Sequence, residues 1–345
     1  MSATSSGFVV RPYADGDRPA LVELLRGVWP HKHDVERHIR ERWWWRWDQP
    51  PVILVEDAQR PGPIGLCVYI PFPLRCRGRE LACAWFVDFF ILPEYQGKGL
   101  GQRLTQYVQD RFDLTASLSQ TAMAYRVFQK MRWSERSRVT LHVHPVPWRG
   151  LFWTPSRGRR ILGFPIDRAL PVCADLDALW GCVRDAYACL SVRSSERILG
   201  RYADQGHRQY QLLCAYQKQA CVGYMIVRAV HPMSGNAPPY YGLIVDYLVA
   251  PDDTATFSIL LSRAVSHLAS LGVRRMAILT TSPADARVLR RRAFLSPDTP
   301  LLGRALRANN KWLTYQAKID ARLVDPGGWF LTMGDCDIDY VWYQE

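Results

Sequence analysis

The sequence has 345 residues, 48% of them hydrophobic, and its 44 basic against 32 acidic residues give a formal net charge of +12. This length predicts about two domains, each with enough apolar residues for a core. No run of 18 apolar residues occurs and the first residues lack the pattern of a secretory signal, so we expect a cytoplasmic protein without a transmembrane helix.

The apolar pattern, taken in chain order, predicts a mixed series of strands and helices. A strand at 8–11 precedes a helix that residues 14–17 would cap, and a basic, tryptophan-rich helical segment covers 31–47. Residues 60–63 predict a turn and residues 71–80 a connector. Further helices are expected at 101–112 and through Tyr125 and Phe128. The predicted strands of this half lie at 8–11, 51–56, 64–70, 81–92, 114–117 and 139–146.

The nine cysteines are scattered, lie mostly in apolar runs and include no CxxC pair. This pattern predicts buried free thiols in a reducing compartment and no zinc site. Near the C-terminus, Asp335, Asp337 and Asp339 have the spacing of a calcium loop. Tyr340 occupies the position where that loop needs glycine, and the chain ends before the twelfth position, so we expect no metal.

Residues 87–101 combine a short apolar run with a glycine-rich turn. The run 87–92 is apolar except for Asp88 and is short enough for a buried strand, which Pro93 ends because proline cannot donate to a sheet ladder. Three glycines at alternate positions then lead into a helical pattern from Gly101. A strand, a glycine-rich turn and a helix start direct free amides and a helix dipole at an anion, here a pyrophosphate. An ordinary glycine loop is the alternative.

The turn sequence Gln-Gly-Lys-Gly-Leu-Gly at 96–101 matches neither the dinucleotide fingerprint nor the Walker loop. It resembles the Gln/Arg-x-x-Gly-x-Gly/Ala signature of the GNAT superfamily of acyl-CoA-dependent N-acyltransferases. The resemblance implies that acetyl-CoA, or another acyl-CoA, is the co-substrate, that strand backbone pairs with its pantetheine arm and that loop amides hold its pyrophosphate. The coenzyme-binding residues implied in this way are Phe90, Ile91, Leu92, Gln96, Gly97, Lys98, Gly99, Leu100, Gly101, Arg103 and Phe128.

The same resemblance implies two catalytic residues. In this family an amine attacks the thioester directly, which requires a base to accept the proton of the amine and an acid to protonate the leaving thiolate. Asp88, a carboxylate within an apolar strand, is the predicted base, since burial would raise its pKa into a useful range. A structural role for Asp88 is the alternative. The family's usual acid is a tyrosine, but Phe128 occupies its position. Tyr125, three residues earlier on the same helix face, is the predicted substitute, with Ser117 and Ser119 as alternatives.

The second half of the chain repeats the order of the first. The sequence at 245–252 mirrors that at 87–94, Val222-Gly223 mirrors Ile64-Gly65, and residues 174–177 mirror 14–17. The second copy has Asp252 and Asp253 where the first has its glycine turn, and like charge opposes anion binding. Asp246 is the counterpart of Asp88 in the copy that lacks the glycine turn. An aspartate present in both copies can have a structural role, and this is the basis of the alternative for Asp88.

We therefore expect an α/β (α+β) fold of two tandem GNAT-like domains, each with a mixed, largely antiparallel central sheet flanked by helices. The expected domains are a catalytic one at 1–150, a degenerate one at 160–322 and an aromatic, acidic tail at 323–345, with Arg157–Arg160 and Pro165 as linker. For two basic segments a structural interpretation is preferred to a binding site. The tryptophans at 43–47 predict an amphipathic helix packed on the sheet rather than a surface on which a sugar or base would stack. The arginines at 287–292 predict a solvent-exposed helix face.

The resemblance implies an N-acyltransferase, most simply an acetyltransferase, that acts on a small amine such as an amino sugar. Residues 329–335 resemble the end of tandem chains from surface-polysaccharide biosynthesis. A non-catalytic acyl-CoA sensor or scaffold is the alternative, favoured by Phe128 in the tyrosine position. A basic surface also suits nucleic acid or an anionic membrane, but charge alone does not favour either as a partner.

Overall fold

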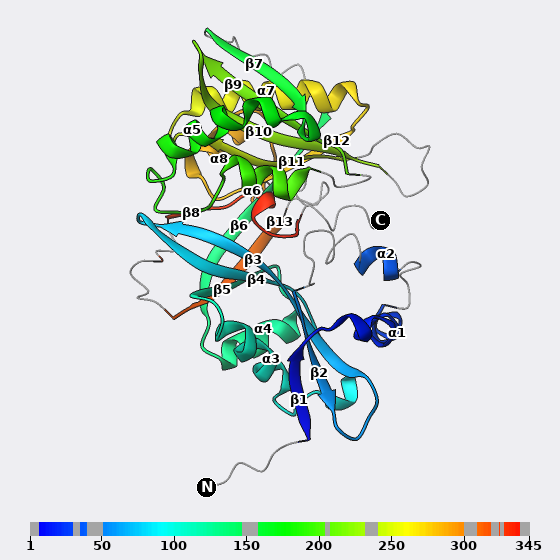
Figure 1. Ribbon diagram of the computed structural model, residues 1–345. Coiled ribbons are helices and arrows are strands. Elements are labelled where there is room, and N and C mark those ends of the chain that lie inside the picture. The colour runs from blue at the N-terminus through cyan, green and yellow to red at the C-terminus, as the bar shows by residue number, and fades with distance from the viewer. Residues whose placement is uncertain are drawn as a thin grey trace. The chain divides into compact units, whose positions relative to one another are not determined.

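The computed structural model describes residues 7–29, 35–39, 51–146, 158–203, 208–231, 241–299, 309–318, 324 and 328–338 (Figure 1). The fold is α+β with mixed, mostly antiparallel sheets, which confirms the predicted fold class. The chain forms two compact units. Unit 1 comprises residues 1–73, 81–137 and 312–321, and unit 2 comprises residues 74–80, 138–311 and 322–345.

Unit 1 is built on strands that follow the order β1-β2-β3-β4-β5-β13. Pairing is antiparallel between β1 and β2, β2 and β3, and β5 and β13, whereas β4 and β5 are parallel. The strands are β1 (Phe8–Pro12), β2 (Val52–Asp57), β3 (Pro63–Cys76), β4 (Arg79–Ile91), β5 (Leu114–Leu118) and β13 (Asn309–Ala317). The helices are α1 (Arg18–Val28), α2 (Val35–Ile39), α3 (Leu100–Gln109) and α4 (Ala122–Lys130).

The sheet of unit 1 is covered on both faces, because successive residues of a strand point to opposite sides. On β2, Ile53 and Val55 join a core with α3 and α4, whereas Val52 and Leu54 join a core with α1 and α2. Figure 1 shows the two helix pairs on opposite sides of these strands. The first core therefore lies directly under α3 and α4, where the glycine-rich turn begins.

Unit 2 has the strand order β6-β12-β11-β10-β9-β7. Its neighbours are antiparallel except β11 and β12, which are parallel. The strands are β6 (Ser134–Pro145), β7 (Arg159–Pro165), β9 (Tyr210–Gln217), β10 (Ala220–Val230), β11 (Tyr241–Val249) and β12 (Arg275–Thr280). The helices are α5 (Cys173–Val183), α6 (Ser195–Tyr202), α7 (Thr254–Ser270) and α8 (Pro283–Arg291). Two short strands, β8 (Cys189–Ser191) and β14 (Trp329–Phe330), pair with each other.

Each half of the chain gives a strand to the sheet of the other half. Strand β13, near the C-terminus, pairs with β5 in unit 1, and β6 pairs through residues 140–145 with β12 in unit 2. The units are therefore not simply consecutive stretches of sequence. The functional division at 1–150, 160–322 and 323–345 stays a prediction.

The internal repeat is visible in the strand pairing. Parallel pairing of β4 with β5 ends at Phe86, and that of β11 with β12 ends at Ile244. The sequence separation between Phe86 and Ile244 is the same as that between Gly65 and Gly223 and that between Asp88 and Asp246. In both units the first strand of the pair continues beyond this point, to Ile91 and to Val249, without further pairing to its parallel neighbour.

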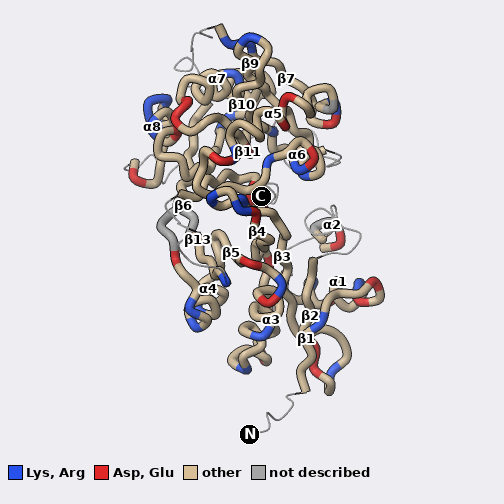
Figure 2. The backbone as a smooth tube through the Cα atoms, turned by 60° about the vertical axis from the view of Figure 1, so that its left-hand side comes forward, with Lys and Arg blue, Asp and Glu red and all other residues tan. Residues whose placement is uncertain are grey.

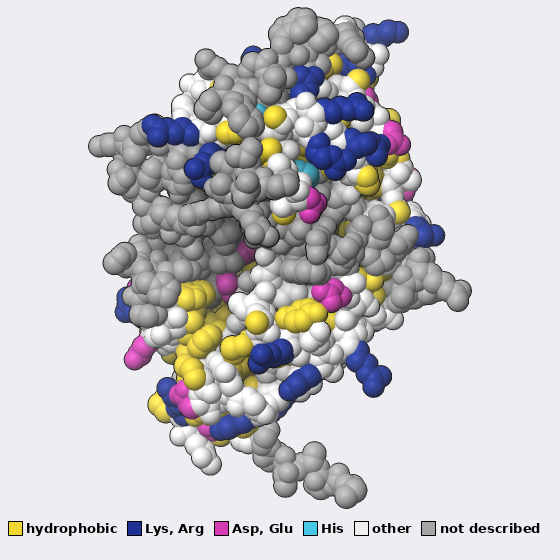
Figure 3. Space-filling view, turned by 180° about the vertical axis from the view of Figure 1, so that it is seen from behind, with side chains coloured by type: hydrophobic (Ala, Val, Ile, Leu, Met, Phe, Trp, Pro, Cys, Tyr) yellow, Lys and Arg dark blue, Asp and Glu magenta, His cyan; other side chains and the backbone are white. Residues whose placement is uncertain are grey.

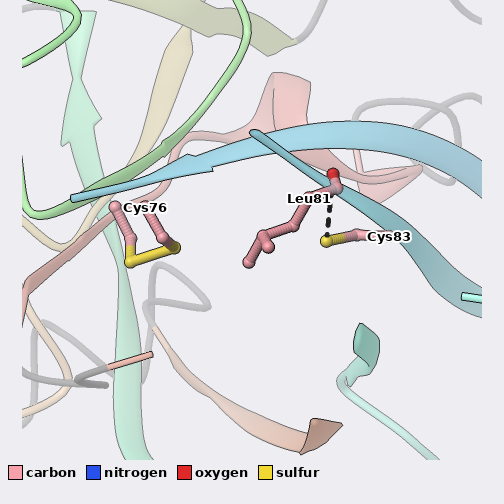
Figure 4. The surroundings of a disulfide bond; sticks show 4 residues. Cys76, Leu81 and Cys83 are labelled. Carbon is pink, nitrogen blue, oxygen red and sulfur yellow. Dashed lines mark hydrogen bonds between the residues drawn. A yellow bond between two sulfur atoms is a disulfide. The ribbon is translucent and has the colours of Figure 1, made fainter. Parts of the chain in front are cut away.

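Three predictions about this fold are wrong. The expected connector at 71–80 is instead the end of β3, a tight turn at Arg77 and Gly78 and the start of β4. The expected linker contains β7, which pairs with β9. Cys76 and Cys189 form a disulfide, so these two cysteines are not free thiols, whereas the other seven are. Figure 4 shows this bond and, near it, the Cys83 thiol donating to Leu81 O.

Candidate functional site

The glycine-rich turn joins the end of β4 to the start of α3. Strand β4 ends at Ile91, a short 3-10 turn covers Pro93–Tyr95, and α3 begins at Leu100. Gly97 and Gly99 have φ values of 79° and 76°, a region that favours glycine because a Cβ atom would clash with the backbone. These two residues let the chain reverse in the few positions between strand and helix.

The amides at the start of α3 belong to residues that line a cavity. The N-cap, Gly99, has no side chain to accept their hydrogen bonds, and no side-chain acceptor of the described residues caps the helix. Glu94, the nearest acidic residue in the turn, is paired with Arg60 at 2.9 Å instead. The helix start therefore keeps unsatisfied N–H groups and a positive dipole end, which together favour an anion.

A cavity of about 450 Å³, here called the loop cleft, opens beside these amides. It is bounded by the end of β4, the glycine-rich turn, the first residues of α3 and residues along the length of α4. Phe90, Ile91, Gln96, Gly97, Gly99, Leu100 and Gly101, all predicted to bind the coenzyme, line it. The other lining residues are Phe89, Tyr95, Gln102, Thr121, Met123, Ala124, Arg126, Val127 and Lys130.

A second cavity of about 610 Å³, here called the basic groove, runs along α3. Its lining residues are Lys98, Gly99, Gln102, Arg103, Gln106, Gln109, Lys130, Met131, Gln316 and Lys318. Figure 2 marks basic residues along α3 and α4 in blue, and Figure 3 shows hydrophobic side chains beside Lys and Arg side chains on one face of the molecule. Lys98 and Arg103, both predicted to contact phosphates, face this groove rather than the loop cleft.

Two predicted side chains fix the local structure of the turn. The Gln96 side-chain amide donates to Ile91 O at 3.0 Å, which fastens the turn to the end of β4. The Lys98 ammonium lies 4.6 Å from the centre of the Tyr95 ring. Both contacts restrict the turn while leaving the helix start open.

Leu92 and Phe128 do not face the loop cleft. The Leu92 amide donates to Ile64 O at 2.9 Å and its carbonyl accepts from Tyr95 N, so both backbone groups already have partners within the protein. Phe128 is 1% exposed and stacks on Trp133 with ring centres 4.1 Å apart. Neither residue is among those that line the cavity.

The predicted catalytic residues lie outside the lining of the loop cleft. Asp88 is half-buried on β4, and its charge adds to burial in raising the pKa of the Cys67 thiol. The Tyr125 hydroxyl donates to Glu135 at 2.8 Å, and this hydrogen bond raises the pKa of Tyr125. Their catalytic roles stay predictions, and the position of Tyr125 does not support its role as the acid.

The alternative hydroxyls are not better placed. Ser117 is buried opposite Thr314 on β13, and Ser119 lies in the loop after β5 with a positive φ of 66°. Among the described residues, the hydroxyl groups that line the loop cleft belong to Tyr95 and Thr121. Sequence reasoning did not assign a role to either, although Tyr95 directly precedes the motif at 96–101.

The equivalent region of unit 2 is occupied by the protein's own side chains. The Tyr187 hydroxyl donates to Val249 O, the counterpart of Ile91 O, at 2.8 Å. Tyr247, the counterpart of Phe89, bonds Thr280 and Asp285 at 2.6 and 2.8 Å and packs against Phe330. These contacts join β11 to β12 and α8 beyond the point where strand pairing ends.

The helix start in unit 2 also differs. Asp253 caps α7 by accepting from the Thr256 amide at 3.0 Å, and it lies 3.5 Å from Arg159. A carboxylate of the protein therefore occupies the position where an anionic ligand would meet the dipole. This arrangement agrees with the two acidic residues that the second copy carries in place of glycines.

Asp246, the counterpart of Asp88, has a structural environment. It is 5% exposed, accepts from Arg193 Nε at 3.2 Å and from Thr332 Oγ1 at 2.8 Å. Arg193 also donates to Asp335 at 2.8 Å, so the C-terminal segment is fastened to β11. Burial raises the pKa of Asp246, and the Arg193 guanidinium opposes this shift.

The described residues contain no group of three or more His, Cys, Asp or Glu side chains arranged to hold a metal ion. The described helices include none that is long and apolar enough to cross a membrane. The tryptophans at 43–47 lie outside the described residues. Arg287, Arg290 and Arg291 are exposed on α8, as a solvated helix face would have them.

Residues 18–125 match the acetyltransferase (GNAT) family model. This match runs from the start of α1 to Tyr125 in the first half of α4, and it includes the end of β4, the glycine-rich turn and most of the loop-cleft lining. No curated protein matches the sequence. The matched residues lie in the N-terminal half of the chain, which also contains the residues that line the loop cleft.

Solved structures with the same fold cover nearly the whole chain. A GCN5-related N-acetyltransferase from Anabaena variabilis is 13% identical, with a TM-score of 0.60 over 90% of this chain and 72% of its own. A tandem GNAT protein from the clavulanic acid biosynthesis pathway is 12% identical, with a TM-score of 0.53 over 91% and 99%. Saccharomyces cerevisiae N-myristoyltransferase is 12% identical, with a TM-score of 0.55 over 91% and 83%. At these identities the likeness concerns the fold.

Proposed function

We propose that this chain, whose residues 18–125 match the GNAT family model, is an acyl-CoA-dependent N-acyltransferase and that the loop cleft of unit 1 transfers an acetyl group to a small amine. The observation that carries the proposal is the open start of α3 beside the loop cleft. Amides that no described side chain caps meet a cavity whose lining is otherwise largely apolar. This combination suits a ligand with a pyrophosphate at one end and a thioester at the other.

The residues that line the loop cleft form a polar group and an apolar group, each suited to a different part of the coenzyme. The N–H groups at Gly97–Gly101 would hold the pyrophosphate, as helix starts do for anions. Phe89, Ile91, Leu100, Met123 and Val127 would pack along the pantetheine arm, because their side chains are apolar and line the same cavity. An acyl-CoA supplies an activated thioester, so the protein has only to orient the amine, accept its proton and stabilise the charge on the carbonyl oxygen.

Proton transfer requires a base and an acid, and we propose one residue for each. Asp88 is the proposed base because it is a half-buried carboxylate three residues before the end of β4. For the acid we place Tyr95 ahead of Tyr125, because Tyr95 lines the loop cleft whereas the Tyr125 hydroxyl is bonded to Glu135. Thr121 is a second lining hydroxyl, but its oxygen already accepts from the Ala124 amide that it caps.

The acceptor that we propose is an amino sugar or another small amine, with surface-polysaccharide biosynthesis as one setting. An acceptor screen with acetyl-CoA, monitored by release of free coenzyme A, should separate amino sugars from polyamines and amino acids. Turnover with small amines supports the proposal. Turnover with protein amines alone would overturn this choice of acceptor while leaving the coenzyme site intact.

A non-catalytic acyl-CoA sensor is the second candidate, and one observation favours it. Phe128 replaces the expected tyrosine and is buried against Trp133. The two functions separate in a single experiment, because both require binding of acetyl-CoA and only the enzyme consumes it. Calorimetric binding without any release of coenzyme A across the amine panel would favour the sensor.

The coenzyme site is tested by Gly99→Glu, which places a side chain and a negative charge at the open helix start. We expect acetyl-CoA binding to be lost in calorimetry. The matched control is Gly158→Glu, because Gly158 has the same φ of 76° and no atom within 4 Å of its missing Cβ. The control carries the same backbone strain and charge in unit 2. Unchanged affinity in Gly99→Glu, or equal losses in both variants, would contradict the site.

A further inference from the structure

Two of the free cysteines lie on neighbouring strands of unit 2, outside the site described above. Cys214 is on β9 and Cys221 is on β10, and the two antiparallel strands are joined by a turn at Lys218 and Gln219. Cys221 lies opposite Tyr216, and Cys214 comes two residues before Tyr216 on the same strand. Because residues two apart in a strand point to the same face, both thiols project from one face of this hairpin.

The two sulfur atoms are within reach of each other. Diagonal neighbours on adjacent antiparallel strands have Cα atoms about 7 to 8 Å apart with Cβ atoms closer, and each cysteine extends one atom further. The thiol of Cys214 donates a hydrogen bond to that of Cys221. The strand register shifts between Cys221 and Gly223, and a bulge of this kind bends the strand and interrupts the ladder. A small local shift at the bulge is therefore enough to bring the sulfur atoms to bonding distance.

The two thiols differ in exposure and in acidity. Cys221 is 9% exposed and follows the exposed Ala220, whereas Cys214 is 0% exposed. The hydrogen bond from Cys214 lowers the pKa of Cys221, and the same hydrogen bond raises the pKa of Cys214. Because the thiolate is the reactive form of cysteine, Cys221 should react first and Cys214 should act as the resolving thiol.

A carboxylate on α5 opposes this reactivity. Tyr216, the residue opposite Cys221, donates from its hydroxyl to Asp175 at 2.8 Å. The negative charge of Asp175 acts to raise the pKa of both thiols, since it disfavours a second anion nearby. Asp175 therefore slows formation of the Cys221 thiolate without blocking access to it.

We propose that Cys214 and Cys221 form a redox-active dithiol that a peroxide oxidises to an intramolecular disulfide. Cys221 Sγ attacks one peroxide oxygen and becomes a sulfenic acid. The O–O bond breaks, and the other oxygen takes the Cys221 proton and leaves as water or an alcohol. Cys214 Sγ then attacks the Cys221 sulfur, whose S–O bond breaks, and water leaves with the Cys214 proton. The dithiol loses the two electrons that reduce the peroxide. This site lies in unit 2 and does not depend on the proposed function of the loop cleft.

The test is brief treatment of the folded, full-length protein with hydrogen peroxide, followed by denaturation, alkylation of the remaining thiols and digestion with trypsin. Lys218 lies between the two cysteines, so trypsin places Cys214 in peptide 209–218 and Cys221 in peptide 219–228. We expect the two peptides to be recovered joined by a disulfide, and their alkylated forms to decrease together. Cys67 is the internal control, because it is a buried free thiol that donates to the carbonyl oxygen of Val68, and it should stay alkylated.

Serine variants test the order of the two steps. In Cys214→Ser the resolving thiol is missing, so a sulfenic acid should accumulate at Cys221 and be trapped by dimedone. In Cys221→Ser the buried Cys214 should stay unmodified. Asp175→Asn should speed formation of the disulfide several-fold, because it removes a charge that opposes the Cys221 thiolate. Cys182→Ser, which removes an exposed thiol, should form the disulfide at the rate of the natural protein.

Peptide mapping of the natural protein decides the proposal even where a serine variant fails to fold. Recovery of peptides 209–218 and 219–228 as separate alkylated species, after a treatment that oxidises the exposed Cys182, would overturn it. Linkage of Cys214 or Cys221 to any other cysteine would also overturn it, because the two thiols would then not react as a pair.

Discussion

A Cβ atom on Gly65 would lie 2.6 Å from the carbonyl oxygen of Phe90, closer than any side chain can approach. The same atom would lie 2.6 Å from the end of the Ile91 side chain. Phe90 and Ile91 both line the loop cleft, so the missing side chain of Gly65 determines how closely β3 approaches the cleft-forming end of β4. In unit 2, a Cβ on Gly223 would lie 3.1 Å from the carbonyl oxygen of Leu248, the counterpart of Phe90.

We predict that Gly65→Ala displaces the end of β4 and weakens acetyl-CoA binding by at least tenfold. Overpacking of this kind costs about 1 to 3 kcal/mol of stability. Gly223→Ala should destabilise unit 2 by a similar amount, because Val249 Cγ1 would lie 2.8 Å from the new atom, while leaving coenzyme affinity unchanged. Calorimetric affinity and the unfolding midpoint are the two measurements.

The control for this pair is Gly181→Ala, on α5, where no atom lies within 4 Å of the missing Cβ. This change should be neutral or stabilising, since alanine is a better helix former than glycine. Equal coenzyme affinity in Gly65→Ala and Gly223→Ala would show that the close approach of β3 does not shape the cleft.

The repeat also provides a test of Asp88 through its counterpart. Asp246→Asn should destabilise unit 2 by about 3 to 5 kcal/mol, because it leaves the buried Arg193 without one of its partners. Asp88→Asn should instead lower kcat by on the order of a hundredfold if Asp88 is the base, with coenzyme affinity retained. A pH profile of kcat completes the measurement, since loss of the base should remove its acidic limb. A folded Asp88→Asn protein with full turnover would retire this role and leave Asp88 as a structural residue.

The sequence predicted the turn and the repeat because both depend on local patterns. Gly97 and Gly99 are glycines where the backbone needs a positive φ, and Gly65 and Gly223 are glycines where two strands approach closely. The end of β3 was missed because Pro71 and Pro73 suggest a connector. Their neighbours Ile70, Phe72, Leu74 and Cys76 are all buried, and this alternation of two is the signal that could have identified the strand.

The features that sequence reasoning missed depend on contacts between distant residues. No local pattern shows that β13 pairs with β5 or that β6 pairs with β12. Strand β7 was interpreted as a linker because it is the last strand in its sheet order, and such strands tolerate the arginines and the proline found there. The position of Tyr125 was missed for another reason: helical spacing gives a face but does not show that Glu135 lies opposite it.

The disulfide between Cys76 and Cys189 predicts a measurable stabilisation. It closes a loop across a sequence separation of 113 residues, which constrains the unfolded chain by on the order of 4 kcal/mol. Cys76→Ser should therefore lower the unfolding midpoint under oxidising conditions, and a reducing agent should lower the midpoint of the natural protein to the same value. Cys182→Ser, which removes an exposed free thiol, is the control.

The same disulfide predicts the thiol count of the denatured, unreduced protein. Seven of the nine cysteines are free, so seven thiols should react before reduction and nine after it. Nine reactive thiols before reduction, together with no effect of Cys76→Ser on the midpoint, would contradict the bond.

The last prediction concerns acid stability and two histidines of β6. His142 and His144 are 2% and 0% exposed, and burial lowers the pKa of each to about 4 from its usual 6.5. Arg290 lowers the pKa of His142 further, and Asp298 opposes this. Because burial disfavours the imidazolium, the folded chain binds fewer protons than the unfolded chain between about pH 4 and pH 6.5. The free energy of unfolding should therefore fall as the pH falls through this window, and it should be fully retained above it.

Each histidine can account for roughly 3 kcal/mol of this loss, since one pKa unit corresponds to about 1.4 kcal/mol. His142→Leu removes one titrating group from a position where neither ring nitrogen has a hydrogen-bond partner among the described residues. Denaturant unfolding at pH 7 and pH 4.5 should show a smaller loss for this variant than for the natural protein. His231→Gln, at an exposed position, should lose as much as the natural protein does. An equal loss in all three proteins would mean that carboxylates alone set the acid stability and that His142 is protonated in the folded chain as readily as in the unfolded one.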